Sequence, residues 1–269
     1  MTLFEPLTSI YLTAIGLVVG SFLNVCIYRL PLGESVVHPP SRCPSCEKRL
    51  RWYQNVPVLA WLVLRGRCGF CRSPISWRYP SIELASGAIV LGSWLWFGPT
   101  PEFFVSVPFA WAMLVLFFTD YDHKLLPDVV TLGGFALGMA LAWWNPFLGA
   151  DEGWPRIWAA VYGAGFGSGV LWGVGALYSR LRGVEAMGMG DVKMMALVGA
   201  FTGVTGVIFT IFAGSVVGAV VGLSLVPLRG RSMQDTLPFG CFLAPAGLAA
   251  LLWAQPIAAA YMQLLRPPM

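Results

Sequence analysis

Long apolar runs recur along almost the whole chain and are separated by short polar segments. Each run is close to the roughly 20 residues that a helix needs to cross the hydrocarbon core of a bilayer. Since a single water-soluble core could not bury them all, we expect an all-α polytopic membrane protein with about eight transmembrane helices. The expected spans are residues 7–30, 82–97, 103–119, 129–144, 157–178, 192–210, 207–228 and 238–264, with a glycine-rich turn at 202–206 joining the sixth and seventh.

Composition agrees with this pattern, because 57% of the residues are hydrophobic, 11% are charged and the mean hydropathy is +0.70. The basic residues also indicate an orientation, because Lys and Arg near span ends stay on the cytoplasmic side. With the N-terminus outside, all of the 17 except Arg156 and Arg266 fall in or beside the inner loops. We therefore expect a multi-pass protein of the inner (cytoplasmic) membrane. Topology and contact with anionic lipid explain the net charge of +4 without a nucleic-acid partner.

A polar stretch, residues 31–79, separates the first two expected spans and contains two Cys-x-x-Cys knuckles. Two such turns facing each other supply the tetrahedral four-sulfur shell that zinc prefers. The knuckles are Cys43 with Cys46, and Cys68 with Cys71. Disulfides are the alternative, although they rarely persist in the reducing cytoplasm. We expect a small zinc-ribbon-like module that depends on its metal to fold, with Cys26 and Cys241 as small core residues elsewhere.

Acidic residues are scarce, 13 in all, and two groups of them border apolar spans on the expected cytoplasmic side. One group contains Asp120, Asp122 and Asp128, and the other is Asp191 after Gly188-Met-Gly190. Ionisable groups at the hydrocarbon boundary are functional candidates. Two close carboxylates can hold one proton between them, so that one activates water while the other donates to the carbonyl oxygen of a peptide bond.

Several other uses of these carboxylates remain open at this stage. Capping or solvation is the favoured interpretation of Asp122 and Asp128, because Asp is common at helix starts and turns. Asp120 and Asp191 could instead carry protons in a coupled transporter, with the zinc module as a regulatory element. A non-catalytic assembly factor is a third possibility.

The sequence resembles the bacterial type IV prepilin peptidases, which belong to the Gly-x-Gly-Asp class of membrane aspartic proteases. The resemblance covers nearly the whole chain and rests on the segments 20–31, 78–84, 119–128 and 185–193 together with the paired knuckles. It implies that Asp120 and Asp191 are the catalytic dyad and that Gly188 and Gly190 form the loop before it. It also implies removal of the leader peptide from type IV prepilins or type II secretion pseudopilins.

The same resemblance implies a second reaction in members with the cysteine module, which is methylation of the new N-terminal amine by S-adenosylmethionine. Gly66 and Arg67 match a Gly-Lys pair that the family uses for methyl transfer. Arginine keeps the charge of lysine but changes the geometry of its donors. We expect three parts in the chain, namely a first span at 1–30, a four-cysteine zinc module at 31–79 and a peptidase bundle at 80–269.

A glycine-rich stretch at residues 163–175 could be mistaken for a nucleotide-binding loop. It lies inside an apolar span and not between a strand and a helix, so it lacks the context that such a loop needs. We expect these glycines to allow close packing of helices in the membrane.

Overall fold

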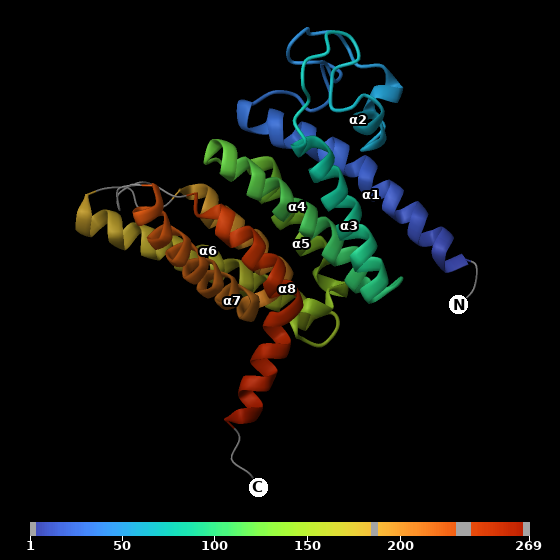
Figure 1. Cartoon of the computed structure of the whole chain (residues 1–269). Coiled ribbons are helices and arrows are strands. Elements are labelled where there is room, and N and C mark those ends of the chain that lie inside the picture. Colours follow the sequence, from blue (N-terminus) through green and yellow to red (C-terminus); the bar gives the residue numbers. More distant parts are fainter. Residues whose placement is uncertain (1–3, 184–187, 230–237, 266–269) are drawn as a thin grey trace. The chain divides into compact units, whose positions relative to one another are not determined.

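The computed structural model describes residues 4–183, 188–229 and 238–265, and within those ranges the chain is helical without strands (Figure 1). Part of the second predicted motif, residues 185–187, lies outside the described residues. So do two of the basic residues used for the orientation, Arg231 and Arg266. The α-helices are α1 (Phe4–Arg29), α2 (Leu59–Val63), α3 (Arg78–Phe97), α4 (Pro101–His123), α5 (Asp128–Leu141), α6 (Trp154–Arg182), α7 (Met189–Arg229) and α8 (Gly240–Leu264). The chain divides into two compact units, Met1–Phe103 and Phe104–Met269.

In the first unit, α1 and α3 lie side by side, as Figure 1 shows. Small residues line the contact, since a Cβ atom added to Gly16 would meet the Cα of Gly87 at 2.9 Å. The hydroxyl of Ser86 donates a hydrogen bond to the carbonyl of Gly16 at 2.6 Å. Small residues that bring two backbones together are typical of helix pairs in membranes. The polar module between the two helices belongs to the same unit.

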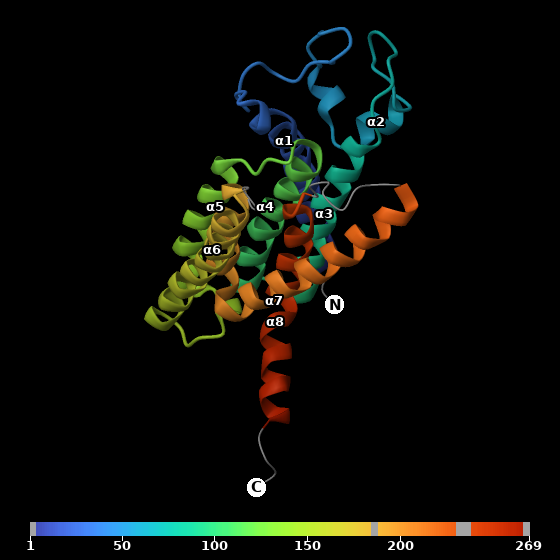
Figure 2. The ribbon, with the colours of Figure 1, turned by 90° about the vertical axis from the view of Figure 1, so that its left-hand side faces the viewer.

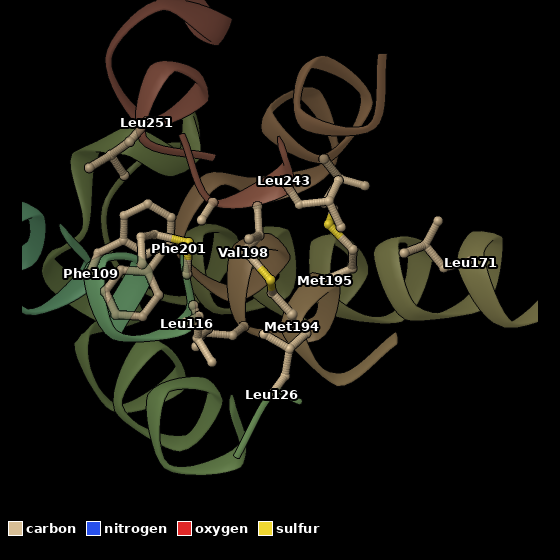
Figure 3. Packing of buried hydrophobic residues seen from close by; sticks show 14 of the residues in the cluster. Phe109, Leu116, Leu126, Leu171, Met194, Met195, Val198, Phe201, Leu243 and Leu251 are labelled. Atoms are coloured by element: carbon tan, nitrogen blue, oxygen red, sulfur yellow. The ribbon is translucent and has the colours of Figure 1, made fainter. Parts of the chain in front are cut away.

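In the second unit, α4, α7 and α8 supply most of one buried apolar cluster (Figure 3). Phe109 and Leu116 of α4 are fully buried, and the rings of Phe109 and Phe201 lie 4.9 Å apart. Met194 and Leu243 complete the centre of this cluster from α7 and α8. The cluster reaches Leu126 in the connection between α4 and α5, so it extends to the helix ends that carry the acidic residues.

The predicted turn between the sixth and seventh spans is confirmed as a break inside α7. Gly203 has a φ of 67°, a left-handed conformation that glycine adopts without strain. The break frees backbone groups, and the buried side-chain amide of Asn145 donates to the carbonyl of Phe201 at 2.9 Å. A buried carbonyl without a partner would be unfavourable, so this bond stabilises the kink. Figure 2 shows α7 changing direction along its length.

The predicted membrane architecture is confirmed. The eight expected spans correspond to α1, α3, α4, α5, α6, the two parts of α7, and α8. Among the described helices, α1, α4, α6, α7 and α8 are long and apolar enough to cross a membrane, and Asp128–Trp144 is a shorter apolar helix. α3 is less apolar because it contains Glu83 among serines and glycines. The protein is therefore a multi-pass, all-α membrane protein.

Candidate active site and metal centre

Asp120 lies in the last turn of α4 and is 5% exposed, which is unusual for a carboxylate. One of its oxygens, Oδ2, accepts a hydrogen bond of 2.8 Å from the backbone N–H of Cys241 at the start of α8. The first N–H groups of a helix have no partner within the helix and carry partial positive charge. The N-terminus of α8 therefore holds the carboxylate of Asp120 in place.

Asp191 lies in the first turn of α7 and is half-buried. Its backbone N–H donates to the carbonyl of Gly188 at 3.2 Å, so the glycine segment folds directly into the helix. Leu126 lies against Gly190, the residue before Asp191, and also against Gly240, which faces the carboxylate of Asp120, so the two aspartates lie at the same end of the second unit. The structure thus brings together two residues that are far apart in the sequence.

Leu126 and two glycines pack the space around this carboxylate pair. A Cβ atom on Gly190 would meet the side chain of Leu126 at 3.0 Å, and one on Gly240 would meet Oδ2 of Asp120 at 2.9 Å. Leu126 is buried and also lies within 3.2 Å of the position of a Cβ on Gly240. Segments from four helix ends therefore converge at one end of the second unit.

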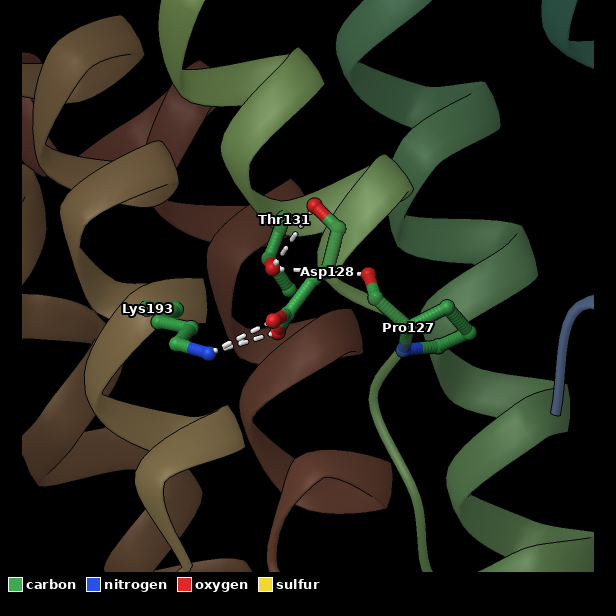
Figure 4. Close-up of polar contacts among 4 residues, drawn as sticks. All are labelled: Pro127, Asp128, Thr131 and Lys193. Atoms are coloured by element: carbon green, nitrogen blue, oxygen red, sulfur yellow. Dashed lines mark hydrogen bonds and ion pairs between the residues drawn. The ribbon is translucent and has the colours of Figure 1, made fainter. Parts of the chain in front are cut away.

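An ion pair joins the two acidic motifs beside the carboxylate pair (Figure 4). The ammonium of Lys193 donates to both carboxylate oxygens of Asp128, at 2.7 and 2.8 Å. Asp128 is the first residue of α5, and Lys193 is on α7 close to Asp191. Asp128 and Asp122 are both exposed, in agreement with a role other than catalysis.

The four cysteines of the knuckles lie together in the first unit. The sulfur atoms of Cys43, Cys46, Cys68 and Cys71 all lie within 4.8 Å of one another, and those of Cys43 and Cys71 are 3.9 Å apart. A tetrahedral ion with bonds of about 2.3 Å would place its sulfurs about 3.8 Å apart. All four cysteines are free, and no disulfide joins them. The cluster could hold a metal ion.

The two knuckles repeat the same backbone geometry, and Figure 2 shows their loops side by side. In each knuckle, the fourth residue after the first cysteine has a left-handed backbone, with φ 55° at Glu47 and 61° at Arg72. That residue donates its N–H to the carbonyl of the first cysteine, at 2.8 Å in one knuckle and 3.0 Å in the other. Although burial opposes ionisation of Cys43, backbone N–H groups of Cys46 and Ser45 donate to its sulfur and lower its pKa to about 6. A thiolate is the form that binds metal.

Gly66 and Arg67 lie between α2 and the second knuckle. Gly66 is buried with φ 66°, and a Cβ there would meet the ring of Trp61 at 3.0 Å, so this position requires glycine. Arg67 is exposed and lines a cavity of about 630 Å³.

Sequence reasoning missed two contacts of the carboxylate site. Cys241 was expected to be a small core residue, and it is buried, but its backbone N–H is also the donor to Asp120. A glycine followed by a small residue at the start of the last helix was the available signal. The pairing of Lys193 with Asp128 was missed as well, because it joins two helices whose register the sequence does not reveal.

Comparisons with known proteins matched two family models. Residues 14–97 match the family model described as the bacterial peptidase A24 N-terminal domain, and residues 107–223 match that of the type IV leader peptidase family. No solved structure gave a significant match.

Curated relatives match over most of their length. A prepilin leader peptidase/N-methyltransferase of Pseudomonas putida is 39% identical, with 94% of this chain and 93% of the relative covered. Proteins with the same name from Stutzerimonas stutzeri and Pseudomonas aeruginosa are each 36% identical, over 94% and 96% of this chain and 93% and 95% of the relatives. The chain therefore belongs to the type IV leader peptidase family.

Proposed function

We propose that this chain is a membrane-embedded aspartic endopeptidase that removes the leader peptide of type IV prepilins or type II secretion pseudopilins, and that it also methylates the new N-terminus. The observation that supports the proposal is that the helix ends carrying Asp120 and Asp191 meet around Leu126 at one end of the second unit. The names of the relatives support the same two activities.

In the proposed mechanism, the two carboxylates share one proton, because like charges at short range do not both ionise. The ionised member deprotonates a water molecule, and the protonated member donates to the carbonyl oxygen of the scissile bond. The N–H of Cys241 orients Asp120 throughout. Gly188 and Gly190 would allow the substrate backbone to approach Asp191 closely.

For the second reaction, we propose S-adenosylmethionine as the methyl donor, with Gly66 and Arg67 contributing to methyl transfer. Arg67 is an exposed cation beside the rigid, buried Gly66, so a ligand with a carboxylate could reach it. We propose zinc as the metal of the four cysteines, where it would supply folding stability to the module and not a catalytic water, because four sulfurs complete its shell.

The proposed orientation places the active site and the cysteine module on the cytoplasmic side of the inner membrane. It rests on the distribution of the basic residues, which follows the rule for cytoplasmic loops. The substrates would be prepilins or pseudopilins. The lipid bilayer would surround most of the chain.

The test is mass spectrometry of a full-length prepilin incubated with the purified protein and S-adenosylmethionine. We expect loss of the leader and gain of one methyl group. Asp120→Asn and Asp191→Asn should each abolish cleavage while the protein remains folded and metal-loaded. Asp122→Asn is the matched control, because Asp122 belongs to the same motif but is exposed, and it should cleave like the parent.

Two outcomes would contradict the proposal. Cleavage by either dyad variant would exclude the two-carboxylate mechanism. The second outcome is a folded, metal-loaded protein that cleaves none of several prepilins. If that protein moves protons across a membrane and depends on Asp120 and Asp191 to do so, the proton-coupled transporter would be favoured.

A further inference from the structure

α2 exposes an apolar face at the surface of the module. Leu59 is 60% exposed, Leu62 56% and Val63 80%. These positions follow the i, i+3, i+4 spacing and therefore share one face of the helix. A soluble module would gain stability by turning such a face inward. The exposure points to an apolar partner outside the module.

The opposite face of α2 is already used inside the module. The indole N–H of Trp61 donates to the carbonyl of Ile75 at 3.1 Å, and its ring packs on Gly66. Leu64 approaches Gly69, where a Cβ would lie 3.5 Å away. The orientation of α2 is therefore fixed by specific contacts, and its exposed face is a consequence of that orientation.

A hydrogen bond holds the start of α2 beside the membrane helices. The N–H of Val58 donates to Oε2 of Glu83 at 2.7 Å, and Glu83 is buried in α3. Glu83 lies against Gly20 of α1. A Cβ atom added to Gly20 would be 2.7 Å from the Cα of Glu83. Since α1 is a membrane-spanning helix, this contact places the start of α2 against the second half of α1, before that helix ends at Arg29. Trp77, which directly precedes α3, is 73% exposed, as interfacial tryptophans are.

An arginine-lined cavity follows directly after this apolar face. The lining residues of the cavity, which has a volume of about 630 Å³, are Val63, Leu64, Arg65, Arg67 and Arg72. All three arginines are exposed, and none is ion-paired to a carboxylate among the residues that the structure describes. Guanidinium groups match phosphate geometry with paired hydrogen bonds. Val63 belongs to both the apolar face and the cavity.

We infer that α2 and this cavity form a docking site for an anionic phospholipid of the adjoining leaflet. The apolar face of Leu59, Leu62 and Val63 enters the acyl-chain boundary, and Arg65 and Arg72 bind the phosphate headgroup. α2 is short and entirely apolar, and apolar burial together with attraction of neighbouring cations to anionic lipid can hold such a segment at the membrane surface. The residues proposed for peptidase chemistry belong to the other unit.

The test is native mass spectrometry of the full-length protein in detergent with equimolar dioleoylphosphatidylglycerol and dioleoylphosphatidylcholine. The parent should retain phosphatidylglycerol selectively. Arg65→Gln with Arg72→Gln should weaken its binding about thirtyfold, since each cation near an anionic lipid contributes about fivefold. Arg67 is left unchanged because it is proposed to act in methyl transfer. Arg180→Gln with Arg182→Gln, two exposed arginines at the end of α6, is the matched control and should bind like the parent.

A second variant tests the apolar face. Leu62→Gln with Val63→Gln should weaken phosphatidylglycerol binding about tenfold through the lost apolar burial. If the double arginine variant loses its metal, the single variant Arg72→Gln is used in its place. Its affinity for phosphatidylglycerol should be about fivefold weaker than that of the parent. Equal retention of the two lipids, or equal binding by the arginine variant and its control, would overturn the inference. Unchanged binding of phosphatidylglycerol by the apolar variant would also overturn it, because it would indicate a phosphate site only. Release of the lipid by S-adenosylmethionine would overturn it as well, because it would assign the cavity to the methyl donor.

Discussion

The carboxylate of Asp120 has little free space around it. Gly240 faces it, and a Cβ there would lie 2.9 Å from Oδ2 and 3.0 Å from Cγ. Gly240→Ala should therefore displace the carboxylate while leaving its chemistry unchanged. A displacement of this kind lowers the rate strongly, because reacting groups need close alignment. We expect prepilin cleavage to slow about tenfold or more, measured as the initial rate of leader release.

Gly169→Ala is the control for this substitution. Gly169 lies exposed in α6, and no atom would come within 4 Å of a Cβ there. It adds the same methyl group to a membrane helix without touching Asp120, so its cleavage rate should equal that of the parent. Normal cleavage by Gly240→Ala would show that the dyad does not depend on the position of Asp120 seen here.

The ion pair of Lys193 with Asp128 positions the segment that carries Asp191, but both partners are partly exposed. Exposed pairs contribute about 0–1 kcal/mol, so we expect Lys193→Met to slow cleavage only about twofold to fivefold. Asp128→Asn should have a similar effect, and the double variant should be no slower than either single variant. Additive losses in this cycle of initial rates would mean that the two residues act separately.

Helix α6 crosses α7 on a row of glycines, and this contact sets the place of α7 in the second unit. A Cβ on Gly163 would collide with backbone atoms of Gly199 and Gly203, and one on Gly167 would lie 2.7 Å from the carbonyl oxygen of Met195. Since backbone cannot move aside as a side chain can, Gly163→Ala should lower the free energy of unfolding by about 1–3 kcal/mol. Thermal unfolding of the purified protein in detergent measures this.

Gly165 provides the control at this crossing. It lies on the same helix but faces open space, so Gly165→Ala should leave the melting temperature unchanged or raise it slightly. Equal melting temperatures for the two alanine variants would contradict the close crossing. The same contrast explains the glycine-rich stretch of α6, because Gly163 and Gly167 are buried in the contact whereas Gly169 and Gly173 face open space.

The helices could be predicted from the sequence because each apolar run is a local signal. The break of α7 was predictable as well, since glycines cluster at residues 202–206. The identity of the glycine that bends, Gly203, depends on which face meets α6 and on the amide of Asn145, and both are tertiary contacts. For the same reason the acidic candidates could be listed from the sequence, but not the N–H of Cys241 that holds Asp120.

The whole molecule separates its two predicted chemistries, since the four cysteines lie in one compact unit and the two aspartates in the other. A module of about 50 residues has a small apolar core and depends on a metal to fold. We expect the parent to hold one metal ion per chain and Cys68→Ala to hold none. Proteolysis should then become faster within residues 31–79, while the second unit stays intact. Cys26→Ala, a cysteine of α1 outside the cluster, should keep the metal.

The separation of the two units also predicts how the two activities respond to loss of the metal. Because the four clustered cysteines and the two aspartates belong to different units, the Cys68→Ala protein should still remove leaders. Methylation should fall at least about tenfold, because Gly66 and Arg67, which we propose for methyl transfer, directly precede Cys68, and misplaced groups can lower a rate about 100-fold. Mass spectrometry of one prepilin measures both reactions in one sample. The Cys68→Ala protein can be compared with the parent only if its second unit resists proteolysis equally well. If that protein then loses both activities, the module takes part in cleavage and the peptidase is not confined to the second unit.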